Sequence, residues 1–411
     1  MTGKIAGIDV HKRVLMVAVG SADSPWDEDF TMRRFGTTSS ELQHLAAWLQ
    51  QCGVQQVVME STAQYWKPVW LNLEAHFRLL LAQAWSNRAP RGKKTDFKDA
   101  QRLVRRHRAG ELTLSFVPDA EQRQMRSLTR RRVQLTHDRV RIHNQVESLL
   151  EETGIKLSCV VSDLFGSSGI RILNALSEGI SEPAALAAMA DHRVQRSAEE
   201  LVDALTGMVS PIHQRILKQH LAMLELIDRQ MQELTAGIGE SMDAHVEAIK
   251  RLAAIPGIRM LAAQQIISEA GPRAAAFDSA PQFASWIGVS PGKNESAGEN
   301  HSSRCAKGNI YLRRVLCQVA QAAVRTKNSH WEQIFRRLLP RLGYTKALWA
   351  VARRLSVVIW KILHEGVEYV EQGALSTPGA VKRRLQRLKK ELRSLGYSDD
   401  LKPLQSIKPV Q

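Results

Sequence analysis

The sequence predicts an α/β domain at the N-terminus, a long helical region after it and a mainly helical unit at the C-terminus. In the first 115 residues, short apolar runs typical of strands alternate with longer amphipathic segments typical of helices. From Asp119 to about Thr153 the chain contains neither glycine nor proline, which indicates one long helix. From about Ala248 onward, apolar helical segments are separated by loops rich in glycine, serine and asparagine.

The N-terminal segments follow an order that is typical of a sheet with mixed pairing. The expected strands are residues 4–10, 14–19, 30–35, 54–59 and 77–82, and the expected helices are residues 39–51, 63–75 and 96–108. Ser39 and Ser40 can cap the first helix, and Gly110 can stop the third. Strands that follow one another directly pair antiparallel, whereas strands separated by a helix can pair in parallel.

Two carboxylates lie within one of the most basic segments of the chain. Asp96 and Asp99 are the only acidic residues between Arg88 and Arg108. Residues three apart on a helix share a face, and a carboxylate pair on a phosphate-attracting surface suits a divalent metal that acts on a phosphodiester. The simpler interpretation is that Asp96 caps the helix and Asp99 is a local counter-ion.

Two further acids come at the ends of expected strands. Asp9 ends the first strand and Glu60 follows the fourth. Functional sites in open sheets gather at strand ends, so we predict one cluster of four carboxylates that binds two divalent metal ions. Its members are Asp9, Glu60, Asp96 and Asp99. The alternative is that Asp9 and Glu60 are ordinary turn residues.

The bulk composition points to nucleic acid as a partner. The chain of 411 residues has a net charge of +16, a pI of about 9.9 and a hydrophobic fraction of 44%. This is a globular protein with a large basic excess. We expect no membrane association, because no apolar segment reaches about 18 residues and no signal peptide is evident. The four cysteines are scattered, which fits a reducing cytosol and argues against a structural zinc site.

The central region carries the spacing of a coiled coil. In the first long helix an apolar residue recurs every seven positions: Leu128, Leu135, Ile142 and Leu149. Arg132 and Arg139 fall on the complementary positions, so we expect them near the seam. A second helix at residues 212–238 has the same spacing, with His220 in its one polar slot. The two helices can pair within one chain or between subunits.

The third unit holds two motifs that bear on chemistry. Residues 252–258, Leu-Ala-Ala-Ile-Pro-Gly-Ile, resemble the turn of a helix-hairpin-helix, whose backbone N–H groups can bind a phosphate; a plain helix connection is the alternative. The following loop presents Ser296 beside Gly298, and a serine there can attack a phosphate if it is activated. Competitors for this role are Ser290, Ser302 and Ser303, and loops are often serine-rich for solubility alone.

Two C-terminal segments complete the sequence. Residues 344–364 form an apolar helix interrupted by Arg353 and Arg354, which indicates core rather than membrane. Beyond Gly373 the tail is polar and basic, either as a helix ordered on nucleic acid or as a solvated extension.

Taken in order, these motifs resemble the DEDD-type insertion-sequence transposases of the bridge-RNA-guided class, which are related to the Piv-type DNA invertases. The matching N-terminal pieces are Gly7-Ile8-Asp9-Val10-His11-Lys12, Val58-Met59-Glu60-Ser61-Thr62 and Lys94-Thr95-Asp96-Phe97-Lys98-Asp99-Ala100. The C-terminal pieces are Ile255-Pro256-Gly257-Ile258, the stretch 283–298 with Ser296, Lys307-Gly308 and Leu312-Arg313-Arg314. The resemblance extends to about Gly366.

The resemblance implies a fold, a cofactor and partners. It implies a RuvC-like, RNase H-fold DEDD catalytic domain (1–115), a coiled-coil region (116–245), a C-terminal transposase domain with a catalytic serine (246–370) and a basic tail (371–411). It further implies Mg²⁺ at the four acids, Ser296 as nucleophile, a guide RNA that pairs with donor and target DNA, and a homodimer or homotetramer. The expected location is the bacterial cytoplasm, in association with the nucleoid.

We expect eleven basic residues to contact nucleic acid, on the basis of charge density and of the resembling motifs. They are Arg88, Arg91, Lys93, Lys94, Arg126, Arg130, Arg131, Arg141, Lys307, Arg313 and Arg314.

Two other functions remain open at this point. The first is a metal-only, RuvC-like nuclease of the Holliday-junction resolvase type, in which water attacks and Ser296 is inert. The second is a non-enzymatic nucleic-acid-binding coiled-coil protein, for which the four ordered acids are a coincidence. A covalent protein–DNA adduct would distinguish the transposase from the first, and metal-dependent strand cleavage would distinguish it from the second.

Overall fold

The computed structural model divides the chain into two compact units, Met1–Asp119 and Ala120–Gln411, each of which is described by itself. The residues that the structure describes are 3–22, 29–61, 63–87, 96–192, 194–292, 294–296, 299–302, 304–371 and 378–394. The division falls close to the boundary expected after residue 115.

The first unit is built on a six-stranded mixed sheet with the order β3-β2-β1-β4-β5-β6. Its strands are β1 (Lys4–Val10), β2 (Leu15–Ser21), β3 (Thr31–Phe35), β4 (Val54–Ser61), β5 (Arg78–Ala82) and β6 (Leu114–Ser115). β1 pairs in parallel with β4, and β4 in parallel with β5, whereas the other neighbours are antiparallel. The predicted α/β order with mixed pairing is therefore confirmed. β6 and the short 3-10 helix η1 (Ala84–Asn87) were not predicted from the sequence.

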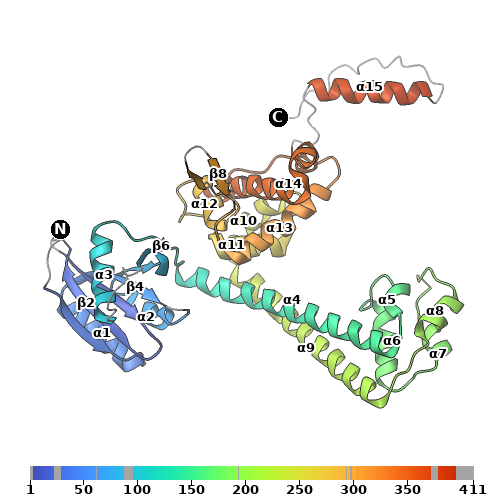
Figure 1. The fold of residues 1–411 in the computed structure, drawn as a ribbon, viewed down its shortest axis with the longest axis horizontal. Helices are drawn as coiled ribbons and strands as arrows, with labels where there is room; N and C mark the ends of the chain where they lie inside the picture. The colour runs from blue at the N-terminus through green and yellow to red at the C-terminus, as the bar shows by residue number, and fades with distance from the viewer. Residues whose placement is uncertain are drawn as a thin grey trace. The chain divides into compact units, whose positions relative to one another are not determined.

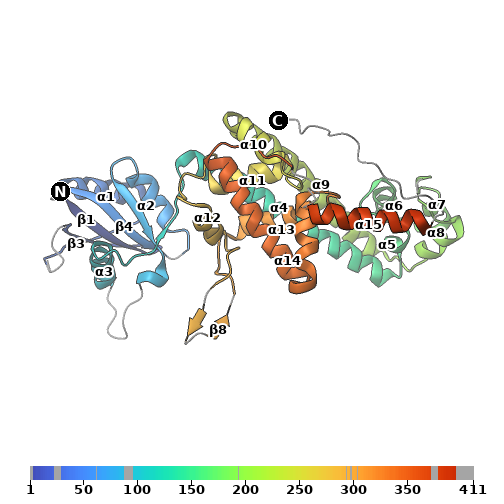
Figure 2. The ribbon, with the colours of Figure 1, turned by 90° about the horizontal axis from the view of Figure 1, so that it is seen from above.

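Helices cover both faces of this sheet (Figure 2). α1 (Ser39–Gln51) and α2 (Trp66–Leu73) pack over one face, where Ala6, Ile8 and Val10 of β1 are buried. α3 (Asp96–Arg108) packs on the other face, where Ile5 of β1 and Val58 of β4 are buried with apolar residues of the helix. Successive strand residues point to opposite faces, so the odd-numbered residues of β1 face α3.

Two helix boundaries differ from the prediction. Thr38, not Ser39 or Ser40, occupies the N-cap position of α1, and no side-chain hydrogen bond caps it. α2 begins at Trp66 rather than at Ala63, because Ala63 has a φ of 55°, which is incompatible with a right-handed helix.

In the second unit two long helices, α4 (Ala120–Thr153) and α9 (Pro211–Ser241), pack along each other within the chain (Figure 1). Leu135 and Ile142 of α4 share one core with Leu217 and Leu224 of α9. The far ends of the two helices are joined through four short helices, which are α5 (Leu157–Val160), α6 (Ser167–Ser177), α7 (Pro183–Ala187) and α8 (Ala198–Leu205).

The two arginines expected near the seam lie on it, and each binds α9. Arg132 Nε donates a hydrogen bond to Thr235 Oγ1 at 3.0 Å, and Arg139 Nε lies 2.6 Å from Asp228 Oδ1. Burial lowers the pKa of His220, which fits a seam residue.

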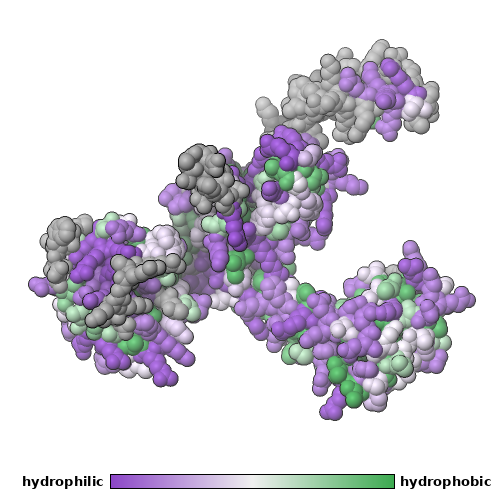
Figure 3. All heavy atoms as spheres, in the orientation of Figure 1, coloured by the Kyte–Doolittle hydropathy of each residue, from purple (hydrophilic) through white to green (hydrophobic). Residues whose placement is uncertain are grey.

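The rest of the second unit is mainly helical. Its elements are η2 (Asp243–His245), α10 (Val246–Ala253), α11 (Met260–Ala270), α12 (Ala280–Ile287), the hairpin of β7 (Asn294–Ser296) and β8 (Glu299–Ser302), α13 (Ile310–Arg325), α14 (His330–His364) and α15 (Pro378–Ser394). The helix expected at 344–364 is the second half of α14, which is kinked at Gly343 after Pro340. None of the described helices is long and apolar enough to cross a membrane, and hydrophilic side chains dominate the face seen in Figure 3.

The turn between α10 and α11 packs closely against α13. Gly257 has a φ of 91°, and a Cβ at this position would lie 2.7 Å from the backbone nitrogen of Ala323 and 2.7 Å from the carbonyl oxygen of Val319. The glycine is therefore required both by the backbone conformation and by helix packing. Phosphate binding by this turn stays a prediction.

We predict that Gly257→Ala lowers the free energy of unfolding by roughly 2–5 kcal/mol, because left-handed strain adds to the clash with α13. The matched control is Gly154→Ala, which has a φ of 82° but no neighbour within 4 Å of its Cβ. This variant should lose only the strain, roughly 1–2 kcal/mol. Urea unfolding of both variants measures the difference, and equal losses would contradict the packing role of Gly257.

Candidate functional site

Two of the predicted acids are direct neighbours at the carboxyl ends of parallel strands. Asp9 of β1 and Glu60 of β4 are paired in the strand register. Ala6 and Ile8 point toward α1 and α2, so the alternation of side chains places Asp9 on the opposite face. Glu60 shares that face, because Met59 beside it points toward α1 and α2. Both carboxylates thus lie on the face that α3 covers.

α3 approaches β1 very closely, because Gly7 has no side chain. A Cβ on Gly7 would lie 2.2 Å from the carbonyl oxygen of Ala100 and 2.9 Å from Cγ2 of Val104. The backbone of the helix therefore rests directly on the strand, two residues before Asp9. This contact places the residue beside Ala100, which is Asp99, on the sheet face that carries Asp9 and Glu60.

Asp99 is buried, with 6% of its surface exposed, and it pairs with an arginine of its own helix. Arg102 Nη1 lies 2.7 Å from Asp99 Oδ1. The same guanidinium nitrogen donates a weaker hydrogen bond to the carbonyl oxygen of Asn87, at 3.4 Å. A buried carboxylate needs such partners, because removing its charge from water is costly.

The fourth acid opens the helix. α3 begins at Asp96, one turn before Asp99, as the sequence predicted. The side chain of Asp96 lies outside the described residues.

Asn87, at the end of η1, belongs to this site although the sequence analysis did not single it out. Its Nδ2 donates a hydrogen bond of 2.5 Å to Glu60 Oε2. Its Oδ1 is buried and has no hydrogen-bond partner in the described part of the chain. Arg106 Nη1 donates a hydrogen bond to the carbonyl oxygen of Ser86, also at 2.5 Å, so α3 fixes η1 in place. The only signal in the sequence is that Asn87 follows β5, a third strand ending at this edge.

His11 completes the set of polar groups around Asp9. Its Nε2 lies 3.1 Å from Asp9 Oδ2, and its side chain is 42% exposed. It follows β1 in the turn to β2, where the strand direction reverses. The ring can orient one oxygen of Asp9.

The arrangement offers hard oxygen atoms, the ligand type that divalent cations such as Mg²⁺ and Ca²⁺ prefer. The buried Oδ1 of Asn87 fits such an ion, because a buried acceptor without a donor is costly. Within the residues that the structure describes, no three His, Cys, Asp or Glu side chains are gathered closely enough to hold a metal ion. The four-carboxylate cluster therefore stays a prediction.

The predicted nucleophile lies in the second unit. Ser296 is the last residue of β7 and pairs with Glu299 of β8 in an antiparallel hairpin. Its side chain lies outside the described residues, as does Ser303. Ser290 and Ser302, the other competitors, lie before β7 and at the end of β8. The choice among these serines is not tested.

Two of the predicted nucleic-acid contacts bind a buried glutamate. Arg130 binds Glu269 with two hydrogen bonds, at 2.7 and 2.8 Å. Arg126 Nε lies 3.4 Å from Glu269 Oε2 and also donates to the carbonyl oxygen of Ser268. Asn309 Nδ2 donates a further hydrogen bond to Glu269, at 2.7 Å. The hydrogen bond with Glu269 raises the pKa of Arg130 against the effect of burial. These arginines tie α4 to α11, which the sequence analysis did not anticipate.

The other basic residues differ in their surroundings. Arg88, Arg91, Lys93 and Lys94 lie outside the described residues. Arg131 and Lys307 are exposed, and Arg141 pairs with Asp138 at 2.9 Å. Arg313 lies over the ring of Trp349, 4.8 Å from its centroid. Arg314 reaches a cavity that is described below.

Comparisons with known proteins match an N-terminal and a C-terminal segment of the chain. Residues 6–155 match a DEDD transposase family model described as "Transposase", and residues 249–336 match the "Transposase IS116/IS110/IS902 family". The chain is similar to a "Probable family 20 transposase" of Pseudomonas aeruginosa, with 28% identity over 75% of this chain and 83% of that protein. It is also similar to the "Transposase for insertion sequence element IS1111A" of Coxiella burnetii, with 23% identity over 88% of this chain and 89% of that protein.

We predict that Gly7→Ala lowers the free energy of unfolding of the first unit by roughly 1–3 kcal/mol, because the new methyl group meets helix backbone. The matched control is Gly20→Ala on β2, whose Cβ would meet only side-chain ends of Arg108 and Phe30. This control should change stability by less than about 1 kcal/mol. Hydrogen exchange of the β1 amides reports the difference, and equal effects would exclude close helix packing at Gly7.

Proposed function

The chain is a DNA transposase of the IS110/IS116 family, and from this premise we propose that it cuts and rejoins DNA with the carboxylates on the α3 face of the sheet and with Ser296. The observation that carries the proposal is the register pairing of Asp9 with Glu60 on the face where Asp99 is buried. Strand cleavage is the chemistry that such a carboxylate face supports on a phosphate backbone.

The DEDD domain implies dependence on a divalent metal, and we propose that the metal is Mg²⁺. Asp9, Glu60, Asp96 and Asp99 would hold it, and when bound it would polarise the scissile phosphate and stabilise the leaving oxygen. The protein's own contribution is to orient these carboxylates. Asn87 orients Glu60, and Arg102 pairs with the buried carboxylate of Asp99.

In the proposed covalent step, the Oγ–phosphorus bond to Ser296 forms as the bond from phosphorus to a sugar oxygen breaks. The leaving oxygen takes up a proton and becomes a strand-end hydroxyl, which balances the proton that Ser296 loses. Attack of another strand-end hydroxyl on the phosphoserine then rejoins DNA and restores the serine. The covalent link conserves the bond energy for rejoining.

We further propose that a guide RNA pairs with donor and target DNA and that a homo-oligomer carries out the reaction. Base pairing would supply the sequence specificity, while the protein holds the backbones. A net charge of +16 supports binding of several strands. The acids and Ser296 are in different units of the chain, which supports completion of the site by a partner protomer.

The first functional prediction concerns Asp99. Asp99→Asn should reduce Mg²⁺-dependent strand cleavage by about 100-fold or more, while nucleic-acid binding stays intact, because a carboxylate of the site is lost. The matched control is Asp138→Asn, because Asp138 pairs with Arg141 at the same helical spacing on the surface. Cleavage of labelled DNA measures both variants, and full activity of Asp99→Asn would rule out its role.

The second functional prediction concerns Ser296. Ser296→Ala should lose the covalent protein–DNA adduct, and mixing it with Asp99→Asn should restore part of the activity if mixed oligomers form. Ser290→Ala and Ser302→Ala are the controls and should keep the adduct. Denaturing gels detect the adduct. Full recombination by Ser296→Ala would refute the assignment and favour a water nucleophile, as in the metal-only nuclease, or another serine.

A further inference from the structure

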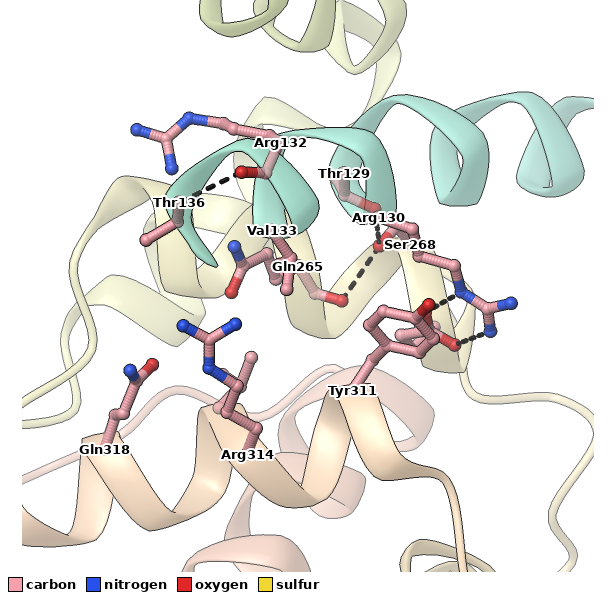
Figure 4. A pocket seen from close by; sticks show the side chains of 12 residues that line it. Thr129, Arg130, Arg132, Val133, Thr136, Gln265, Ser268, Tyr311, Arg314 and Gln318 are labelled. Carbon is pink, nitrogen blue, oxygen red and sulfur yellow. Dashed lines mark hydrogen bonds and ion pairs between the residues drawn. The ribbon is translucent and has the colours of Figure 1, made fainter. Parts of the chain in front are cut away.

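A second polar site lies entirely within the second unit, in a cavity between α4, α11 and α13 (Figure 4). Its volume is about 110 Å³. Pockets for drug-sized ligands measure roughly 300–1,000 Å³, so this cavity suits a single chemical group rather than a whole nucleotide. Three arginines and one glutamate line it, which are Arg130, Arg132, Arg314 and Glu269.

The glutamate is already neutralised by other residues. Glu269 accepts two hydrogen bonds from Arg130 and one from Asn309, and Arg126 lies beside it. The remaining charges in the cavity wall are therefore positive. Arg132 on α4 is one of them, although its Nε is bound to Thr235.

Among the charged groups that line the cavity, Arg314 has a buried atom without a hydrogen-bond partner in the described residues. It projects from α13 into the space between α13 and α4, with its guanidinium near Gln265 (Figure 4). Its Nη1 is buried and forms no hydrogen bond within the part of the chain that the structure describes. A buried cationic donor without an acceptor is strongly unfavourable, whereas an anion in the cavity would satisfy it. The planar fork of an arginine matches the oxygens of a phosphate group.

A second, open hollow with a mainly apolar lining lies along α4. Arg314 also lines this second hollow, together with His137, Val140, Arg141, Asn144, Gln145 and Ser148 of α4, and no carboxylate of the described residues lines it. These α4 residues lie three or four positions apart, or are neighbours, and so share one face of the helix. From Arg130 to Ser148 the helix rises about 27 Å, which is long enough for several phosphates of one strand.

We propose that Arg314 binds one phosphodiester group of a nucleic-acid strand that lies along this face of α4. The proposal rests on the proposed function only in taking nucleic acid as the ligand. Gln265 and Gln318 offer amide donors to the same phosphate. The contacts of Arg126 and Arg130 with Glu269 hold α4 and α11 together. The cavity therefore keeps its shape before a nucleic-acid strand binds.

The experiment compares Arg314→Gln with Arg325→Gln in the full chain. Arg325 is an exposed residue of the same helix outside the cavity, so both variants lose one charge. Binding of labelled single-stranded DNA and RNA oligonucleotides is measured in EDTA at several salt concentrations. EDTA removes divalent metal ions, so neither cleavage nor metal-dependent binding at the carboxylates of the first unit contributes. Arg314→Gln should weaken binding about tenfold and lower the salt slope by about 0.7, while Arg325→Gln should change affinity less than about twofold.

Thermal unfolding without nucleic acid separates this role from a structural one. Arg314→Gln should unfold at the same temperature as the wild type or higher, because it removes a buried Nη1 group that has no hydrogen-bond partner in the described residues. Inorganic phosphate should raise the unfolding temperature of the wild type and not that of the variant.

A preference for DNA or RNA in the binding data identifies which kind of strand binds along α4. Equal affinities and slopes for the two variants, or a lower unfolding temperature of Arg314→Gln, would overturn the proposal. Loss of cleavage by Asp99→Asn is measured separately, so either proposal can fail alone.

Discussion

The close contact between α3 and β1 at Gly7 is the constraint on which the candidate site depends. A methyl group at this position would lie 2.2 Å from the carbonyl oxygen of Ala100, so only glycine lets the helix rest on the strand. This contact places a helix that carries Asp99 over the sheet face that carries Asp9 and Glu60. Three acids far apart in sequence are thereby brought to one face, where we propose that a metal-dependent reaction on a phosphodiester takes place.

The polar groups around these acids hold them in place, although one of these groups has a buried atom without a hydrogen-bond partner in the described residues. Asp99 is stabilised by Arg102, and the same arginine reaches η1. Asn87 in η1 holds Glu60 but leaves its own Oδ1 buried without a donor. A fold optimised for stability alone would avoid such an atom. The Arg314 guanidinium in the second unit also has a buried atom without a hydrogen-bond partner in the described residues, but this atom is a donor and not an acceptor. Both features indicate sites shaped for a ligand.

Local patterns in the sequence predicted most of the strands, the long helices and the places of Asp9 and Glu60 at strand ends, because all of these follow from side-chain periodicity. The positions of Arg132 and Arg139 on the seam followed from the heptad for the same reason. By contrast, Arg130 pairs with Glu269, which lies 139 residues later in the chain. No local pattern in the sequence could predict this contact. Asn87 was missed because its role depends on a tertiary contact with Glu60.

The most direct test of the central claim is a crystal structure of the full chain in saturating Mn²⁺, a cation with the same preference for oxygen ligands as Mg²⁺ and a measurable anomalous signal. The account predicts anomalous density on the α3 face of the sheet, with carboxylate oxygens of Asp9, Glu60 and Asp99 at roughly 2.0–2.6 Å from the ions. An absence of density there at saturation, or ions bound elsewhere while these carboxylates point apart, would contradict it.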